Sequence, residues 1–443
     1  MKTEITLKNI LIITLPIILG LVAQNIINVT NTIFLGHLSE VALGAGAIGG
    51  LFYFCFIILG AGFGIGVQII IGRRNGENNF AGINKIFFNS LYVAALLSIL
   101  LFIILYFYSD IFLKSIVHSE RVFAETSCYI HYRQWGLFFA YISIILRSFY
   151  IGTLRTKVLI YSTLLMSVVN IFFDYSLIFG NFGFPQLGVG GAGIASVIAE
   201  ISDIIFLTGW IFMSGSISKF KMYKFPKPDI QSILYVMKLS YPMMLQYFLS
   251  FGAWFIFFVI IEKIGELELA VSNVVRSFYM VIMIPVWGLG SATNSMVSNL
   301  MGNKQADKVT LLIKKMIILS LSATVIIVLS YIFIPEKIMG FYSKDVMLIK
   351  ASIPVLYVIS VTIIFFSVSY IIFSAVSGSG NTMYAFFIEA ITIALYVSFA
   401  YLTGIVFKQK LFIVWSVEIV YFIVLGLLSY IYFIKYKWKN IEI

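Results

Sequence analysis

Residues 9–35 read NILIITLPIILGLVAQNIINVTNTIFL and contain no Asp, Glu, Lys or Arg. A membrane-spanning α-helix needs about 20 consecutive apolar residues, so this stretch alone is long enough to cross a bilayer. It does not alternate between polar and apolar residues as a barrel strand would. It is also too long for a signal peptide and has no small-residue cleavage site. We therefore expect residues 9–35 to be retained as a first transmembrane helix.

Eleven further apolar stretches of this kind follow along the chain. They cover residues 45–71, 84–108, 123–152, 158–180, 188–214, 232–261, 269–300, 311–334, 346–377, 383–407 and 411–434. Hydrophobic residues make up 61% of the sequence and charged residues only 11%, against about 25% charged residues in soluble domains. The sequence therefore predicts an all-α integral membrane protein with twelve transmembrane helices.

Most of the positively charged residues are predicted to lie on one side of the membrane. With the N-terminus inside, 19 of the 30 Lys and Arg residues lie in or beside the termini and the even-numbered loops, and only eight lie on the other side. This is the bias of cytoplasmic loops toward Lys and Arg. We expect both termini to be cytoplasmic and the helices to span the cytoplasmic membrane. The net charge of +11 then reports topology, and no nucleic-acid partner is expected.

The sequence repeats itself at one gapless offset, the distance from Pro16 to Pro242. Leu15-Pro16 recurs as Tyr241-Pro242, and Gly62-x-Gly64 recurs as Gly288-x-Gly290 at the same offset. The pattern Gly152-x-x-x-Thr156 likewise recurs as Gly378-x-x-x-Thr382. Several matches at one offset predict two homologous halves of six helices each.

The repeat also predicts the symmetry of the halves. Six is an even number, so both halves have the same orientation, and a pseudo-twofold axis along the membrane normal relates them. We expect an N-terminal lobe at 1–215, a cytoplasmic linker at 216–231 and a C-terminal lobe at 232–443, facing each other across a central cleft. Such parallel repeats are typical of transporters that work by alternating access. No nucleotide-binding loop, metal cluster or catalytic triad was found in the sequence, so we do not expect an enzyme or an ATP-driven pump.

Asp174 is the most informative polar residue within a predicted helix. Asn170 precedes it by four residues and therefore lies on the same helical face. A carboxylate in a membrane helix is costly and usually functional, although a structural hydrogen bond to a neighbouring helix is the alternative. Burial in an apolar lobe favours the neutral form of such a group, so we expect Asp174 to load and unload a cation.

Helix 1 carries a polar stripe at Gln24, Asn28 and Asn31, spaced i, i+4 and i+7. Helix packing through amide hydrogen bonds would also explain it. At a rise of about 1.5 Å per residue, Asn31, Asp174 and Ser196 lie at a similar depth from the outer surface. Three helices of one lobe thus place polar groups at one level, which is typical of a small-cation site.

Three further acids, Glu200, Asp203 and Glu389, lie within predicted helices. Each is a second protonation site, the partner of a membrane arginine such as Arg133 or Arg147, or a residue that lies nearer a helix end. A fourth acid, Glu418, has less sequence context. The two cysteines, Cys55 and Cys128, are expected to be buried free thiols.

These motifs resemble the multidrug and toxic compound extrusion (MATE) family over essentially the whole chain. The resemblance rests on Leu15-Pro16, the helix 1 end Thr30-Asn31-Thr32 through Gly36-His37-Leu38, and Gly152-Thr153-Leu154-Arg155-Thr156-Lys157. It continues in Asn170 with Asp174, in Gly191 to Ser196, and in Pro242 with Gln246. The family exports organic cations in exchange for sodium or protons.

The resemblance implies an N-lobe cation site at Asp174, Asn170 and Ser196. Family members commonly carry Asp where this chain has Asn31, so the site would hold one carboxylate. With neutral oxygen donors beside it, this carboxylate suits either a proton or Na⁺ held at Asp174 and Asn170, and we favour the proton slightly. No acid lies at mid-membrane depth on helix 7 or in the middle of helix 10, so coupling is expected to rest on the N-lobe.

The expected substrates are amphipathic organic cations, exported by a monomer without a cofactor. Helix position alone suggests Gln24, Asn28, Gln246, Asn273 and Met280 as cavity residues, and Pro16 as a hinge that bends helix 1. The alternative is a flippase for lipid-linked oligosaccharides of the same superfamily, which would need a more basic cavity. A non-transporting membrane receptor or scaffold is a third class, against which the repeat and Asp174 argue.

Overall fold

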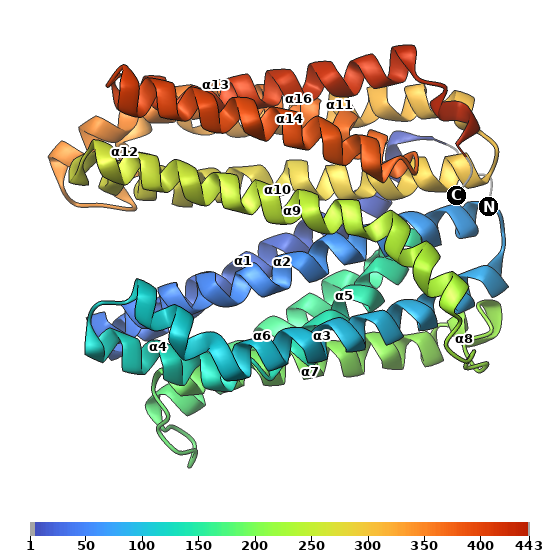
Figure 1. Ribbon diagram of the computed structural model, residues 1–443, viewed down its shortest axis with the longest axis horizontal. Helices are drawn as coiled ribbons and strands as arrows, with labels where there is room; N and C mark the ends of the chain where they lie inside the picture. The colour runs from blue at the N-terminus through green and yellow to red at the C-terminus, as the bar shows by residue number, and fades with distance from the viewer. Residues whose placement is uncertain (1–4, 442–443) are drawn as a thin grey trace. The chain divides into compact units, whose positions relative to one another are not determined.

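The computed structural model describes residues 5–441, and almost all of them are helical (Figure 1). Eleven helices are long and apolar enough to cross a membrane. A twelfth span is formed by α4 and α5 together, which meet at a bend of 52°. There is no strand within residues 5–441. The predicted all-α class with twelve membrane-spanning segments is confirmed.

The spans follow each other through short connections. The first half contains α1 (Leu7–Leu38), α2 (Glu40–Gly76), α3 (Phe80–Ile116), α4 (Glu120–Arg133) with α5 (Gly136–Gly152), α6 (Lys157–Phe179) and α7 (Val189–Met213). The second half contains α9 (Ile230–Ile264), α10 (Glu266–Gly302), α11 (Val309–Tyr331), α13 (Val346–Gly378), α14 (Thr382–Tyr401) and α16 (Val417–Lys435). Shorter elements are α8 (Ser216–Lys219), η1 (Ala306–Lys308), α12 (Pro335–Gly340), the π-helical η2 (Leu402–Val406), α15 (Leu411–Trp415) and η3 (Trp438–Asn440).

The contacts divide the chain into two compact units. The N-unit consists of Leu19–Met244, and the C-unit consists of the described residues up to Ile18 together with those from Leu245 onward. Both boundaries fall two residues after a helix-internal proline, Pro16 in α1 and Pro242 in α9. The first segment of α1 therefore packs with the C-unit and the first segment of α9 with the N-unit. The lobes expected at 1–215 and 232–443 were defined by the internal sequence repeat and not by packing, and their boundaries remain a prediction.

Glycines allow these two first segments to pack closely. A Cβ atom at Gly62 of α2 would lie 2.6 Å from the Cα of Met244, and one at Gly288 of α10 would lie 3.2 Å from the Cα of Ile18. The two pairs are related by the repeat offset. Small residues let helices approach within membranes, where packing replaces the hydrophobic effect as the driving force. Each unit thus uses the same glycine contact to hold a helix segment from the other half of the sequence.

A second glycine contact repeats inside each unit. A Cβ at Gly152 would lie 3.0 Å from the carbonyl oxygen of Gln68, and one at Gly378 would lie 2.5 Å from that of Asn294. The repeat offset again relates the two contacts. The internal repeat read from the sequence is therefore a repeat of packing as well.

The linker after α7 is bound to the N-unit. The amide of Asn84 donates to the carbonyl of Lys221 at 2.9 Å, and Asn89 Oδ1 accepts from the backbone N–H of Asp229 at 2.9 Å. Asp229 also accepts from Ser232 and pairs with Lys85 at 2.9 Å, and these contacts lower the pKa of its carboxyl to about 2. The linker is thus anchored to α3.

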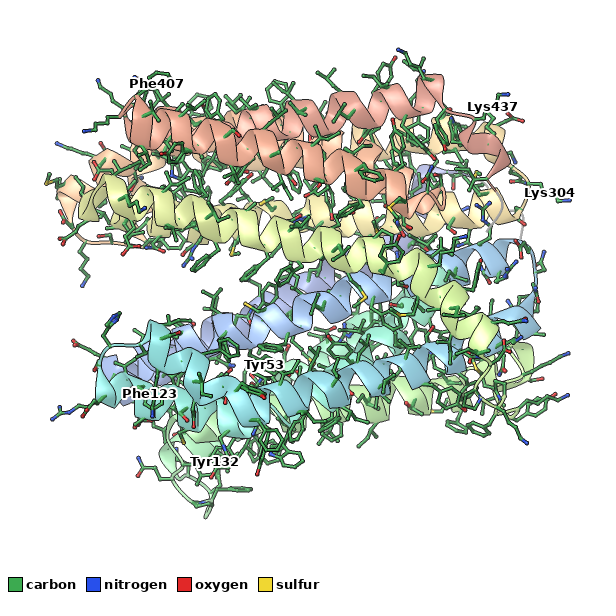
Figure 2. The ribbon with its side chains drawn as sticks, viewed as in Figure 1. Tyr53, Phe123, Tyr132, Lys304, Phe407 and Lys437 are labelled. Carbon is green, nitrogen blue, oxygen red and sulfur yellow. The ribbon has the colours of Figure 1, made fainter. Side chains whose placement is uncertain are left out.

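Loop residues of the C-unit can be assigned to its two ends. Figure 2 shows Lys304 and Lys437 at the same end, and Phe407 at the opposite end. Lys304 and Lys437 are among the 19 Lys and Arg residues in or beside the termini and even-numbered loops, which are expected on the cytoplasmic side. Phe407 precedes Lys408 and Lys410, which belong to the opposite set. This placement agrees with the charge bias, whereas the orientation in the membrane stays a prediction.

Gly62→Ala should destabilise the protein because its new methyl group overlaps the backbone of Met244. Overpacking of this kind costs about 1–3 kcal/mol, so the thermal unfolding midpoint in detergent should fall. Gly50→Ala is the matched control, since Gly50 lies in the same helix and no atom lies within 4 Å of its Cβ position. Equal midpoints for the two variants would contradict the close packing of α9 on α2.

Candidate functional site

The residues Asn31, Asn170 and Asp174 lie together in the N-unit. Asn170 and Asp174 are one turn apart on α6, and neither is exposed. When the Asn31 amide is oriented to satisfy its neighbours, its nitrogen donates to Asp174 Oδ2, to Asn170 Oδ1 at 2.9 Å and to the carbonyl of Ile27 at 3.1 Å. The polar face of α1 therefore meets the polar face of α6, as their common depth suggests.

Two atoms of this cluster stay without partners. Asp174 Oδ1 and Asn170 Nδ2 are buried and form no hydrogen bond to any residue in the described part of the chain. A buried polar group without a partner costs about 1–3 kcal/mol, more if it is charged. The Arg133 and Tyr129 side chains are near enough to Asp174 to interact electrostatically but do not hydrogen-bond to it. The cluster is therefore incompletely satisfied at the Asp174 carboxyl.

Ser196 is on α7, which packs closely along α6. Its side chain is partly exposed and forms no hydrogen bond to the residues that the structure describes. The structure thus brings Asn31, Asn170 and Asp174 together and leaves Ser196 without a hydrogen bond to them. Its role as a cation ligand remains a prediction.

Glu200 is paired with an arginine. Its two carboxylate oxygens accept from the Arg133 guanidinium at 2.5 and 3.0 Å, in a bidentate arrangement. The same guanidinium lies over the ring of Tyr53 on α2, 4.0 Å from the centroid (Figure 2 labels this tyrosine). The cation–π contact and the two hydrogen bonds offset the cost of burying Arg133.

Asp203 forms a second pair one turn along α7. Arg147 donates to its oxygens at 2.8 and 3.2 Å, and the hydroxyl of Ser143 donates at 2.5 Å. Arg147 also reaches Thr163 on α6 at 3.2 Å. Of the alternatives for Glu200 and Asp203, the structure supports pairing with Arg133 and Arg147. Asp174, which is as deeply buried as Asp203, lacks such a pair.

Glu389 lies in the C-unit and has a different environment. It is buried on α14 and accepts from the hydroxyls of Ser250 and Tyr421, both at 2.5 Å. No arginine or lysine of the described residues pairs with it. It therefore differs from Glu200 and Asp203.

The expected cavity residues are distributed over both units. Gln24 and Asn28 belong to the N-unit, and Gln246, Asn273 and Met280 belong to the C-unit. Asn28 and Met280 are exposed, Gln24 and Asn273 are partly exposed, and Gln246 is buried. The substrate cavity remains a prediction, as does the hinge at Pro16, which lies within the continuous helix α1.

A family model described as MatE matches residues 16–176 and again residues 242–402. The chain belongs to the MatE family. The two matched segments begin at residues 16 and 242, which are the two prolines that define the repeat. The predicted resemblance to this family is confirmed.

Individual relatives extend the comparison to the full length. The chain is 28% identical to the probable multidrug resistance protein NorM of Rhizobium meliloti, over 62% of this chain and 59% of that protein. It is 26% identical to the protein of the same name from Thermotoga maritima, over 98% of this chain and 93% of that protein. The chain thus spans less than two thirds of the Rhizobium relative but nearly all of the Thermotoga one.

Solved structures show the same fold at low identity. A MOP superfamily transporter from Pyrococcus furiosus superposes with a TM-score of 0.88 at 19% identity, covering 98% of this chain and 97% of that one. The eukaryotic MATE transporter AtDTX14 superposes with a TM-score of 0.86 at 19% identity, covering 98% and 96%. This MatE chain therefore shares the fold of these two solved structures over 98% of its length.

Sequence reasoning missed the tyrosines around the buried acids. Tyr53 and Tyr129 flank the N-unit site, and Tyr279, Tyr396 and Tyr421 surround the acids of the C-unit. One signal was available, because Tyr279 follows Tyr53 at the repeat offset. Tyr175 and Tyr401 also match at this offset, and two matching pairs among 26 tyrosines are too weak a signal without the structure.

Arg147→Met should strongly destabilise the N-unit because it leaves Asp203 buried without its charge partner. Breaking a buried pair costs about 3–5 kcal/mol, which thermal unfolding in detergent would report. The double variant Arg147→Met/Asp203→Leu should recover most of this loss, since no charge is then left alone. A double variant as unstable as the single one would contradict the pairing.

Proposed function

We propose that this MatE-family chain exports amphipathic organic cations across the cytoplasmic membrane, in exchange for a cation that enters through Asp174. The observation that carries the proposal is the fully buried Asp174 carboxyl, which has no basic partner bonded to it and one oxygen without a hydrogen bond. The relatives from Rhizobium meliloti and Thermotoga maritima, both called probable multidrug resistance proteins, support export of drugs as the activity.

The proposed mechanism follows from the cost of charge in the N-unit. Buried among apolar residues, an ionised Asp174 is unfavourable unless a cation neutralises it. A proton arriving from outside binds at the carboxyl and removes the charge, and release on the inside restores it. The loaded and unloaded states differ in how the carboxyl interacts with Asn31 of α1. A ligand that binds two states unequally shifts the balance between them, so loading would bias which side is open.

The coupling ion in this proposal is a proton. A sodium ion would require several oxygen ligands at the site, as hard cations do. In the satisfied orientation, however, the Asn31 amide presents its nitrogen to Asp174 and Asn170. Asn31 therefore supplies a hydrogen-bond donor to the carboxyl, whereas Na⁺ would need the Asn31 amide to turn over. A single proton fully neutralises a site with one carboxylate.

The proposed hinge is Pro16, in the first third of α1. Pro16 removes a backbone hydrogen bond within α1, and the unit boundary follows it at Ile18. The segment before the boundary packs with the C-unit and the segment after it carries Asn31. A change at Asp174 is thus expected to act on a helix that is shared by both units.

The proposed cavity is lined by Gln24, Asn28, Gln246, Asn273 and Met280. Adaptable side chains such as Met tolerate ligands of many shapes. We propose that the protein works as a monomer in the membrane, without a cofactor and with both termini inside. Susceptibility of cells with and without the gene to cationic dyes and drugs tests the substrate class. Unchanged susceptibility together with loss of an envelope polysaccharide would contradict export and favour the flippase.

Asp174→Asn should abolish efflux driven by a proton gradient, because an amide cannot take up the coupling proton. Fluorescence of a cationic dye in everted membrane vesicles measures this, with Glu262→Gln, an exposed change in α9, as the matched control. Folding should be preserved, since an amide fits the same hydrogen bonds. Wild-type efflux by Asp174→Asn under the same gradient would make this site structural.

Asn31→Asp should be tolerated and should change the ion dependence of efflux. A second carboxylate beside Asp174 repels it and shifts the pH range over which the site loads, and it adds an oxygen ligand suited to sodium. Rates of dye efflux as a function of pH and of sodium concentration would show the shift. Identical profiles for Asn31→Asp and wild type would contradict direct contact between Asn31 and the coupling site.

A further inference from the structure

The C-unit contains a buried carboxyl group held only by hydroxyls. Glu389 on α14 is 3% exposed, and its Oε1 accepts from Ser250 of α9 and from Tyr421 of α16, both at 2.5 Å. Its Oε2 accepts no hydrogen bond from the described residues. Two donors therefore converge on one oxygen, and the other oxygen is left to carry a proton.

A second carboxyl group of the same kind lies nearby. Glu418 on α16 is 5% exposed, and its oxygens accept from the hydroxyls of Tyr396 at 2.9 Å and Tyr279 at 3.3 Å. The rings of Tyr396 and Tyr421 lie 5.6 Å apart, so the tyrosine that bonds to Glu418 packs on the tyrosine that bonds to Glu389. The two acids belong to one network.

Tyrosines are the titratable groups that surround these acids. The tyrosines that interact with Glu389 come from α9, α13 and α16. Those near Glu418 come from α10, α14 and α16, and a further tyrosine from α11 interacts with the one from α10. They are Tyr247, Tyr370 and Tyr421 for Glu389, then Tyr279, Tyr396 and Tyr421 for Glu418, and Tyr331 beside Tyr279. No arginine or lysine of the described residues interacts with either acid.

An independent orphaned group lies one turn from Ser250. Gln246 is 8% exposed, and its Oε1 has no hydrogen-bond partner among the described residues. Its position on α9, four residues before Ser250, puts it on the helical face that meets Glu389. A buried amide oxygen without a donor is costly, and a protonated carboxyl is the kind of donor that satisfies it. Gln246 thus adds an unsatisfied buried acceptor to the same helix that supplies Ser250 to Glu389.

The internal repeat relates this network to the N-unit site. Tyr279 and Tyr396 occupy the positions that the repeat offset pairs with Tyr53 and Asn170. The position equivalent to Asp174 is Ala400, which has no polar side chain. The repeat pairs α14 and α16 with α6 and α7, but Glu389 and Glu418 fall at the positions of Thr163 and Ala192. The C-unit thus carries its unpaired carboxyls on the equivalent helices but at other positions than Asp174.

We propose that Glu389 and Glu418 form a second proton-loading centre, confined to the C-unit. The inference rests on the proposed function and deepens it, since a cation-coupled exporter would then load protons in both units. Each loading step adds one proton to a carboxylate oxygen and changes its charge from −1 to 0. With hydroxyls as their only partners, neutralisation by a proton is the remaining way to remove a buried charge. For Glu200 and Asp203, by contrast, the buried charge is neutralised by the guanidinium groups of Arg133 and Arg147.

Infrared difference spectroscopy of the purified full-length protein tests the proposal without substrate. Protonated carboxyl groups absorb in a carbonyl-stretching region of their own, and the sample is titrated from about pH 5 to pH 9, where buried carboxyls can lose protons. We expect Glu389→Gln and Glu418→Gln each to remove one titrating band. Tyr421→Phe should move the Glu389 band in frequency without removing it. Spectra that do not change with pH in this region, or bands unaffected by both glutamine variants, would overturn the proposal.

Two further variants separate this result from the coupling proposal at Asp174. Asp174→Asn should remove a band of its own and leave the Glu389 and Glu418 bands in place. Glu262→Gln, on the exposed end of α9, should leave all of these bands unchanged. If Asp174→Asn transports normally while the two C-unit bands persist, the N-unit proposal fails and the second centre stands. If the C-unit bands are missing while Asp174→Asn blocks efflux, the reverse holds.

Discussion

Inside a hydrocarbon layer, each charged side chain must be paired, hydrogen-bonded or neutralised, since burial of an isolated charge costs at least several kcal/mol. This constraint decides the interior of the protein. Arg133 neutralises Glu200 and Arg147 neutralises Asp203, each in an ion pair with two hydrogen bonds. Asp174 accepts a hydrogen bond only from the amide of Asn31, and this incomplete satisfaction is why we propose Asp174, and not Glu200 or Asp203, as the coupling acid.

The two units meet the same constraint with different chemistry. The N-unit pairs Glu200 and Asp203 with Arg133 and Arg147, so these buried charges are neutralised by ion pairs. The C-unit buries Glu389 and Glu418 among hydroxyls, which stabilise a carboxyl in either protonation state. Homologous halves thus share backbone packing at the glycine contacts while their polar centres have diverged.

Much of the fold could be predicted because its signals are local or periodic. The lack of charges in residues 9–35 predicts a span, and the offset between Pro16 and Pro242 predicts the repeat. Helix depth predicted a common level for Asn31, Asp174 and Ser196, but it could not tell that Asn31 contacts Asp174 while Ser196 forms no hydrogen bond to either. The arginine partners of Glu200 and Asp203 could be named only as an alternative, because pairing depends on how helices rotate against each other. The tyrosines around Glu418 were missed for the same reason.

The glycine contacts at Gly62 and Gly288 have a consequence for the history of the chain. In each, the first segment of one half packs on the second helix of the other half. A shorter ancestral polypeptide carrying a single repeat could make this contact only by exchanging that segment with another copy. Such a precursor would have been a domain-swapped homodimer, and fusing its two copies end to end would have preserved the swap within one chain.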